Sequence, residues 1–266
     1  MPCVIDAKPF ARNKLIAIAS VSNPGEQHDL RPAGHLLGVS PPARGQPIGH
    51  SALAALYRQA TPSYGRATVP VLWDDKAGAI VNNESSEIIV VLNQAFEAFA
   101  ARKLDLYPVE LKDAVDQWNA KIYPAVNNGV YRCGFAQSQA AYDRACSDLF
   151  TVLDEIDQVL ATQRYLCGDR LTLADVRLFT TLFRFDTVYY SLFKCSRRRI
   201  ADYEHLSGYV RDIYQQPGVA STCNLAAVKR DYFGNLFPLN PGGLIPQGPE
   251  VDFGAACDRN RDYSRL

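Results

Sequence analysis

The spacing of apolar residues changes near residue 100, from short runs typical of strands to long stretches with the period of a helix. In the first part, an apolar run at 68–73 is followed by a turn from Asp74 to Gly78 and by a second apolar run at 79–82. This pattern predicts a β-hairpin. Glu84 and Ser85 then precede a segment rich in Ile and Val, which predicts the start of a helix.

In the second part of the chain, apolar residues recur mostly at the spacing of one helix face. Pro108 suits a first helical turn, and apolar residues recur at intervals of three and four over 111–122. This spacing predicts a helix that ends near 127–129, where Asn-Asn-Gly occurs. A second apolar stripe over 141–160 predicts another helix, and Gly168 marks the turn after it.

The rest of the sequence predicts two more helices and then a tail rich in Pro and Gly. Residues 172–175, Thr-Leu-Ala-Asp, are typical of a helix cap, and 203–215 predicts a helix that Pro217-Gly218 stops. Many Pro and Gly residues after 236 predict an extended strap, which we expect to be disordered after Gly254. The pattern predicts a mixed α/β domain, an all-α domain and a strap, at 1–98, 99–235 and 236–266.

Composition limits the classes of partner. The chain has 28 basic and 28 acidic residues among 266, so it offers no basic field for nucleic acid or for an anionic membrane. It contains no apolar run of roughly 18 residues and no signal-peptide pattern. Its seven cysteines lack CxxC or metal-ligand spacing, which predicts free thiols in the cytoplasm and no metal site.

The hairpin and the helix start predict a small-molecule site built mostly from backbone. Pro70 cannot donate to a sheet and suits a tight, cis-compatible bend, which leaves the backbone of Val69 to pair with an extended ligand such as a peptide. The free N–H groups at the helix start near Ser85 favour a carboxylate, whereas the Glu84 side chain can accept an amine. The alternative is that Glu84 and Ser85 form an ordinary helix cap.

Several blocks resemble one enzyme family in order and spacing. They are 64–89, Asn-Asn-Gly-Val-Tyr at 127–131, 178–186, Phe-Lys-Cys at 193–195, and 203–219. They are similar to the glutathionyl-hydroquinone reductases, the Xi class of glutathione transferases. The resemblance implies a thioredoxin-like domain followed by a helical bundle, and a cytoplasmic homodimer. It implies glutathione as the bound cofactor, with contacts from Arg66, Ala67, Thr68, Val69, Glu84 and Ser85.

The resemblance fails at the family's nucleophile. The family has a Cys-Pro-Trp-Ala motif at a helix start, where a thiol pKa is lowered. The nearest match here is Lys-Pro-Phe-Ala-Arg, which puts Lys8 in the place of the cysteine. Cys3 lies five positions earlier, either as a displaced nucleophile or as an ordinary thiol near a terminus. We expect the first domain to be shortened or atypical before about residue 47, or the sequence to be an incomplete version of a longer one.

Three tyrosines carry the other part of the implied mechanism. By resemblance, Tyr131 donates a proton to the departing quinol carbon, and Tyr189 and Tyr232 line the electrophile pocket. Packing of aromatic side chains is the alternative. The implied function is glutathione-dependent reduction of glutathionyl-hydroquinones by thiol transfer, with aromatic glutathione conjugates as substrates. The alternative is a protein of this fold that binds glutathione or an apolar ligand without turnover, because the nucleophilic cysteine is missing.

Overall fold

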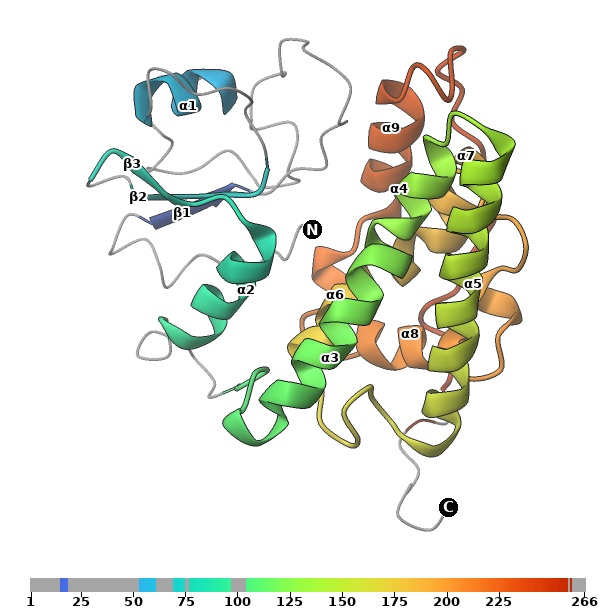
Figure 1. Cartoon of the computed structure of the whole chain (residues 1–266), viewed down its shortest axis with the longest axis horizontal. Helices are drawn as coiled ribbons and strands as arrows, with labels where there is room; N and C mark the ends of the chain where they lie inside the picture. Colours follow the sequence, from blue (N-terminus) through green and yellow to red (C-terminus); the bar gives the residue numbers. More distant parts are fainter. Residues whose placement is uncertain are drawn as a thin grey trace. The chain divides into compact units, whose positions relative to one another are not determined.

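The computed structural model describes residues 15–18, 53–60, 69–74, 77–96, 104–257 and 259. The chain packs as two compact units, Met1–Asp105 and Leu106–Leu266. Figure 1 shows a small sheet with helices in the first unit and helices throughout the ribbon of the second. The predicted boundary between residues 98 and 99 lies outside the described residues.

The first unit contains a three-stranded antiparallel sheet in the order β1, β2, β3 (Figure 1). Its elements are β1 (Leu15–Ile18), α1 (Leu53–Ala60), β2 (Val71–Asp74), β3 (Ala79–Asn82) and α2 (Ser85–Gln94). Leu56 and Tyr57 of α1 pack on Val71 and Trp73 of β2, and all four are buried. The hairpin and the helix that the sequence predicts are therefore confirmed.

Local chemistry fixes the hairpin. Gly78 has a φ of 63°, a conformation that suits glycine, and the backbone N–H of Ala77 donates to Asp74 Oδ1 at 3.0 Å. The peptide bond between Val69 and Pro70 is cis, at the bend where the sequence allowed it.

The second unit is helical. Its elements are η4 (Val109–Leu111), α3 (Lys112–Ile122), η5 (Tyr123–Asn127), α4 (Gly129–Gly134), α5 (Gln139–Thr162), α6 (Leu173–Arg184), η6 (Phe185–Tyr189), α7 (Tyr190–Leu192), η7 (Ile200–Asp202), α8 (Leu206–Tyr214), η8 (Ala220–Thr222) and α9 (Leu225–Asn235). The predicted helices over 111–122, 141–160 and 203–215 correspond to α3, α5 and α8. Its core is formed by apolar stripes such as Leu149, Leu153 and Ile156 of α5.

One helix boundary was predicted wrongly. Residues 127–129 do not end the helical path, because the chain passes through one π-helical segment, η5, into α4. The backbone N–H of Asn128 donates to Tyr123 O at 2.8 Å, five residues back. The side chain of Asn127 donates to Arg177 O at 3.0 Å and to Thr181 Oγ1 at 2.7 Å, so it joins this segment to α6 instead of stopping it.

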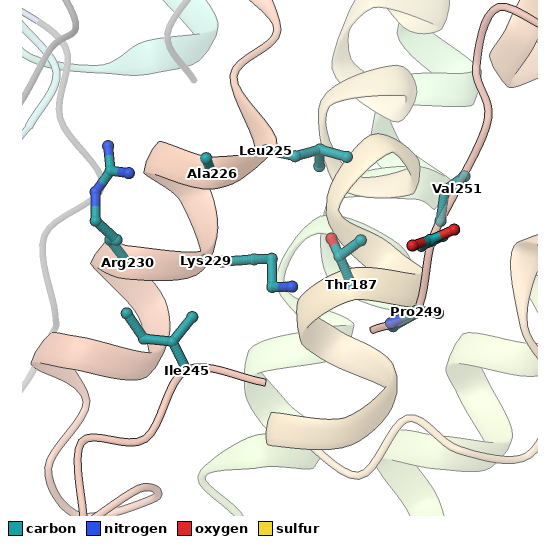
Figure 2. Close-up of a pocket in the computed structure, with 9 residues that line it drawn as sticks. Thr187, Leu225, Ala226, Lys229, Arg230, Ile245, Pro249 and Val251 are labelled. Carbon is teal, nitrogen blue, oxygen red and sulfur yellow. The ribbon is translucent and has the colours of Figure 1, made fainter. Parts of the chain in front are cut away.

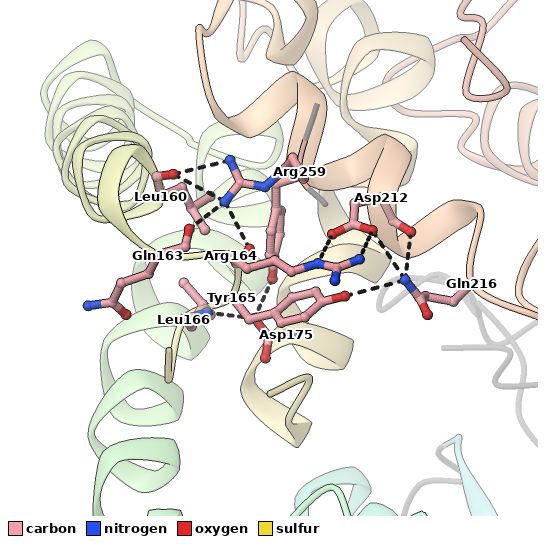
Figure 3. A network of polar contacts seen from close by, with 10 residues as sticks. Leu160, Gln163, Arg164, Tyr165, Leu166, Asp175, Asp212, Gln216 and Arg259 are labelled. Carbon is pink, nitrogen blue, oxygen red and sulfur yellow. Dashed lines mark hydrogen bonds and ion pairs between the residues drawn. The ribbon is translucent and has the colours of Figure 1, made fainter. Parts of the chain in front are cut away.

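The predicted cap at Thr172 is confirmed. Its partner Asp175 belongs to a buried polar network, part of which is shown in Figure 3. Asp175 is fully buried and accepts hydrogen bonds from the N–H of Leu166 at 2.9 Å and the N–H of Thr172 at 2.8 Å. It also accepts from the hydroxyls of Thr172 and Tyr209, both at 2.8 Å. Asp175 thereby ties the start of α6 to α8 and to the turn after α5.

The tail after Leu236 contains no helix or strand within its described part, yet it is held to the helices. The ring of Phe253 packs on Phe183, with ring centroids 5.0 Å apart. Gln215 Nε2 donates to Ala255 O at 2.8 Å, and the buried Arg259 donates to Leu160 O at 3.1 Å. The expected disorder after Gly254 is therefore wrong at Ala255 and Arg259, because these backbone and side-chain groups have partners in the helical unit.

No helix within the described ranges combines the length and the apolar character needed to cross a membrane.

Candidate functional site

The predicted site in the first unit is described only in part. Val69, Glu84 and Ser85 lie among the described residues, whereas Arg66, Ala67 and Thr68 lie outside them. Cys3 and Lys8 lie outside them too. Val69 and Ser85 are half-buried and Glu84 is exposed.

The geometry around Glu84 shows how the helix start is formed. Glu84 is the N-cap of α2, and its Oε1 accepts from Ser86 N at 3.1 Å and from the Ser86 hydroxyl at 3.0 Å. Its own N–H donates to Asn82 Oδ1 at 2.6 Å, which fixes the turn from β3 into α2. The capping interpretation of Glu84 is thus confirmed. A cap of this kind holds an exposed carboxylate beside the partial positive charge of a helix start.

The three predicted tyrosines of the second unit converge, although they come from different helices. Tyr131 lies on α4, Tyr189 ends η6 and Tyr232 lies on α9. Their hydroxyls form a chain, with 2.6 Å between the oxygens of Tyr131 and Tyr232 and 2.8 Å between those of Tyr189 and Tyr232. Such a chain can pass a proton along its oxygens.

The three hydroxyls differ in burial, from a buried end at Tyr189 to a partly exposed end at Tyr131. Tyr189 and Tyr232 are each 3% exposed, and Tyr131 is half-buried. Loss of solvation raises the pKa of Tyr189 and of Tyr232 well above the usual value, and the neighbouring Tyr131 raises both further. The Arg184 guanidinium opposes both shifts, so a positive charge lies near the two buried hydroxyls. The two buried phenols, Tyr189 and Tyr232, therefore remain protonated at neutral pH.

Sequence reasoning missed two features of this site. Arg184 is 5% exposed at the end of α6, where an arginine following an apolar stripe was the available signal. Phe193 packs on Tyr131 and Tyr189, with ring centroids 5.2 Å apart in both pairs. The Phe-Lys-Cys block at 193–195, one of those that carry the family resemblance, was the available signal.

Gly134 permits the close approach of α4 and Phe193. A Cβ at Gly134 would lie 2.6 Å from the Phe193 ring, closer than real contacts allow. We expect Gly134→Ala to lower the free energy of unfolding by about 1–3 kcal/mol, the usual cost of overpacking. Urea denaturation measures this change.

Gly234→Ala is the matched control for that variant. Gly234 lies on α9, and nothing is within 4 Å of a Cβ there, so alanine should be neutral or stabilising. Equal stability of the two variants would show that the Phe193 side chain moves away from an alanine at position 134 at little cost in stability.

A separate cavity of about 470 Å³ lies in the second unit between α9, η6 and the tail (Figure 2). It is lined by Thr187, Leu225, Ala226, Lys229, Arg230, Ile245, Pro249, Glu250 and Val251. Lys229 lies three residues before Tyr232 on α9, and its Nζ donates to Gln247 O at 2.7 Å. None of the three clustered tyrosines lines this cavity.

Among the residues that the structure describes, no group of three His, Cys, Asp or Glu side chains is arranged to hold a metal ion.

Comparison with known proteins identifies the fold. Residues 139–212 match the family model "Glutathione S-transferase, C-terminal domain". The glutathione-bound structure of YqjG from Escherichia coli K-12 matches with 48% identity and a TM-score of 0.78, over 80% of this chain and 70% of that one. The Xi-class transferase of Natrialba magadii matches with 42% identity and a TM-score of 0.81, over 84% and 68%. These matches define a protein of the glutathione transferase fold.

A curated relative gives the same result. The glutathionyl-hydroquinone reductase YqjG of Escherichia coli (strain K12) is 51% identical over 201 residues, which are 75% of this chain and 61% of the relative. This chain thus spans less than two thirds of that relative's length. The chain belongs to the Xi class of the glutathione transferase family, as the sequence blocks predicted.

Proposed function

We propose that this protein uses glutathione to reduce glutathionyl-hydroquinones to hydroquinones. The observation that carries this proposal is the chain of tyrosine hydroxyls, which ends at the half-buried Tyr131. The names of relatives support it, because YqjG and PcpF of Sphingobium chlorophenolicum are both glutathionyl-hydroquinone reductases, 51% and 48% identical to this chain.

The reaction requires both a thiolate and an acid. A thiolate attacks the glutathione sulfur of the conjugate, and the electron pair of the broken carbon–sulfur bond passes to the aromatic carbon. Tyr131 delivers the proton that this carbon needs, Tyr232 donates a hydrogen bond to the resulting Tyr131 phenolate across their 2.6 Å contact, and water then returns a proton to Tyr131. The positive charge of Arg184 near the Tyr232 hydroxyl strengthens the hydrogen bond that Tyr232 donates to this phenolate. A second glutathione then attacks the mixed disulfide and leaves as glutathione disulfide.

The first unit would bind glutathione. In this proposal, the backbone of Val69 pairs with the cysteinyl part, and Glu84 and Ser85 hold the γ-glutamyl end. Arg66, Ala67 and Thr68 supply further contacts. The carboxylate positioned at the start of α2 supports this assignment. The glutathione-bound structure of YqjG supports glutathione as the ligand.

Glutathione titration of Glu84→Gln tests the binding site. Glutamine keeps an oxygen that can cap α2 but removes the charge that receives the ligand amine. We expect the binding free energy of glutathione to weaken by about 1.5–3 kcal/mol, the range for hydrogen bonds to charged groups. Isothermal titration calorimetry measures this loss.

Glu204→Gln is the control, because Glu204 is exposed and belongs to the second unit. Its affinity should stay at the wild-type value. Equal affinities for all three proteins, or no heat with wild type, would remove the proposed site.

Turnover with Cys3→Ser tests which sulfur attacks. Cys3 is the one cysteine before residue 133 in this sequence, so its assignment as nucleophile, against that of an ordinary thiol near a terminus, is the one to test first. Turnover by wild type and its loss in Cys3→Ser would support this assignment. Glutathione binding without turnover by wild type would instead support a binding protein.

For location and assembly, we propose a cytoplasmic homodimer. Six cysteines in the described part of the chain are free thiols, which are typical of a reducing compartment. Light scattering of the purified protein would determine its assembly.

A further inference from the structure

Two cations line the cavity between α9, η6 and the tail, and one of them points into it. Figure 2 shows the Lys229 side chain extending from α9 towards Thr187 of η6, whereas the Arg230 side chain extends away from η6. Within the described part of the chain, Lys229 Nζ has one hydrogen-bond partner, Gln247 O at 2.7 Å. An ammonium group has three N–H donors, so two of them remain for a molecule in the cavity.

The positive charge of the lining is not balanced. No ion pair joins Lys229 or Arg230 to an acid among the residues that the structure describes. Glu250 is the only carboxylate among the lining residues, so the lining carries two positive charges and one negative charge. A ligand with one negative charge would balance this excess. Thr187 cannot hold such a charge in place of Lys229, because its buried hydroxyl donates to Arg184 O at 3.3 Å.

The rest of the lining is apolar. It comes from Leu225 and Ala226 of α9 and from Ile245, Pro249 and Val251 of the tail. The volume of about 470 Å³ lies within the range of small-molecule sites, roughly 300–1,000 Å³. Such sites combine apolar walls with a few polar groups that fix the orientation of the ligand. The cavity therefore suits an apolar body that carries one acid group.

Hydrogen bonds hold the wall that the tail supplies. Asn240 Nδ2 donates to Phe233 O of α9 at 2.6 Å and to Leu244 O at 2.9 Å. These bonds anchor the start of the tail to α9, and Lys229 anchors the tail again at Gln247. A preformed wall lowers the cost of binding, because less of the chain has to be ordered by the ligand.

We propose that this cavity binds a small organic carboxylate with one negative charge and an apolar body, such as an aromatic monocarboxylate. The carboxylate accepts hydrogen bonds from the remaining donors of Lys229, and the apolar body packs on the walls from α9 and the tail. None of the three clustered tyrosines lines the cavity, so this site is separate from the one proposed for the reduction of glutathionyl-hydroquinones. Its walls nevertheless belong to elements that carry two of them, because Tyr232 lies on α9 and Tyr189 ends η6.

Calorimetric titration with 2-naphthoate tests the site, and 2-naphthamide serves as the neutral analogue of the same shape. Wild type should bind the carboxylate more tightly than the amide. Lys229→Met keeps the length of the side chain and removes its charge, so it should weaken binding of 2-naphthoate by roughly 10- to 100-fold, the range for hydrogen bonds to charged groups. Binding of 2-naphthamide should stay near its wild-type value.

Lys112→Met is the matched control for the loss of one positive charge, because Lys112 is exposed at the start of α3. Its affinity for 2-naphthoate should equal that of wild type. Ile245→Asp tests the other wall. Ile245 is 45% exposed in the tail, so the variant should fold, and its new carboxylate should repel the ligand and weaken binding.

The outcomes separate this site from general attraction of anions and from the proposed reductase activity. If Lys229→Met fails to melt cooperatively, Ile245→Asp decides the result. No heat from wild type with 2-naphthoate, equal affinities of wild type and the two cavity variants, or an equal loss in Lys112→Met would overturn the proposal. The measurement is binding without glutathione, so its result does not depend on whether the protein reduces glutathionyl-hydroquinones.

Discussion

Replacement of Tyr131 by phenylalanine is expected to slow hydroquinone release by roughly 100- to 10,000-fold, the range for losing a general acid. The substitution removes one oxygen and leaves the ring in contact with Phe193 and Tyr189. The hydroxyl chain then loses its open end, and the aromatic carbon has no phenol to supply its proton. Steady-state rates with a glutathionyl-hydroquinone, followed by chromatography of the product, measure the effect.

Tyr107→Phe is the matched control for this measurement. The Tyr107 hydroxyl donates to Asp116 at 2.7 Å, outside the cluster, so its removal should leave the rate unchanged. Glutathione affinity should be the same in both variants, because Tyr131 acts in the chemical step. A Tyr131→Phe enzyme with the wild-type rate would show that the proton comes from another group.

Replacement of Asp175 by alanine is expected to lower the free energy of unfolding by roughly 3–5 kcal/mol, because buried donors left without partners each cost about 1–3 kcal/mol. Four donors converge on this carboxylate, from Leu166, Thr172 and Tyr209. Their loss would affect the start of α6 and the contact of α6 with α8. Urea denaturation followed by circular dichroism measures the change.

Asp148→Ala provides the comparison for that loss. Asp148 is exposed and pairs with Arg132 at 2.9 Å, and surface pairs of this kind contribute roughly 0–1 kcal/mol. A similar small change in Asp175→Ala would mean that water replaces the carboxylate.

Elements with strong local signals were predictable from the sequence. The hairpin, α2, α5 and the cap of α6 each follow from alternation, a long apolar stripe or a capping residue. In contrast, η5 and η6 depend on five-residue backbone hydrogen bonds, which apolar spacing does not encode. Helix α9 was missed, although Asn224 caps it by accepting from Ala227 N at 2.9 Å.

The candidate site shows the same limit. Residue spacing alone does not place Tyr131, Tyr189 and Tyr232 together, because they lie 43 to 101 positions apart and meet only through helix packing. The resemblance to the family was what identified these three tyrosines as candidate site residues. The role of Glu84 as a cap could be predicted because its partners Ser85 and Ser86 are its immediate neighbours.

Arg259 connects the end of the described chain to the middle of the sequence. Its guanidinium donates to the carbonyls of Leu160 and Arg164, which lie 99 and 95 positions earlier, at and just beyond the C-terminal turn of α5. Helix ends carry carbonyls without helical partners, so this residue completes a helix that has been synthesised long before it. Contacts across such long loops form late in folding. The final turn of α5 therefore matures only when the chain returns to it, and amide exchange there should report the last step of folding.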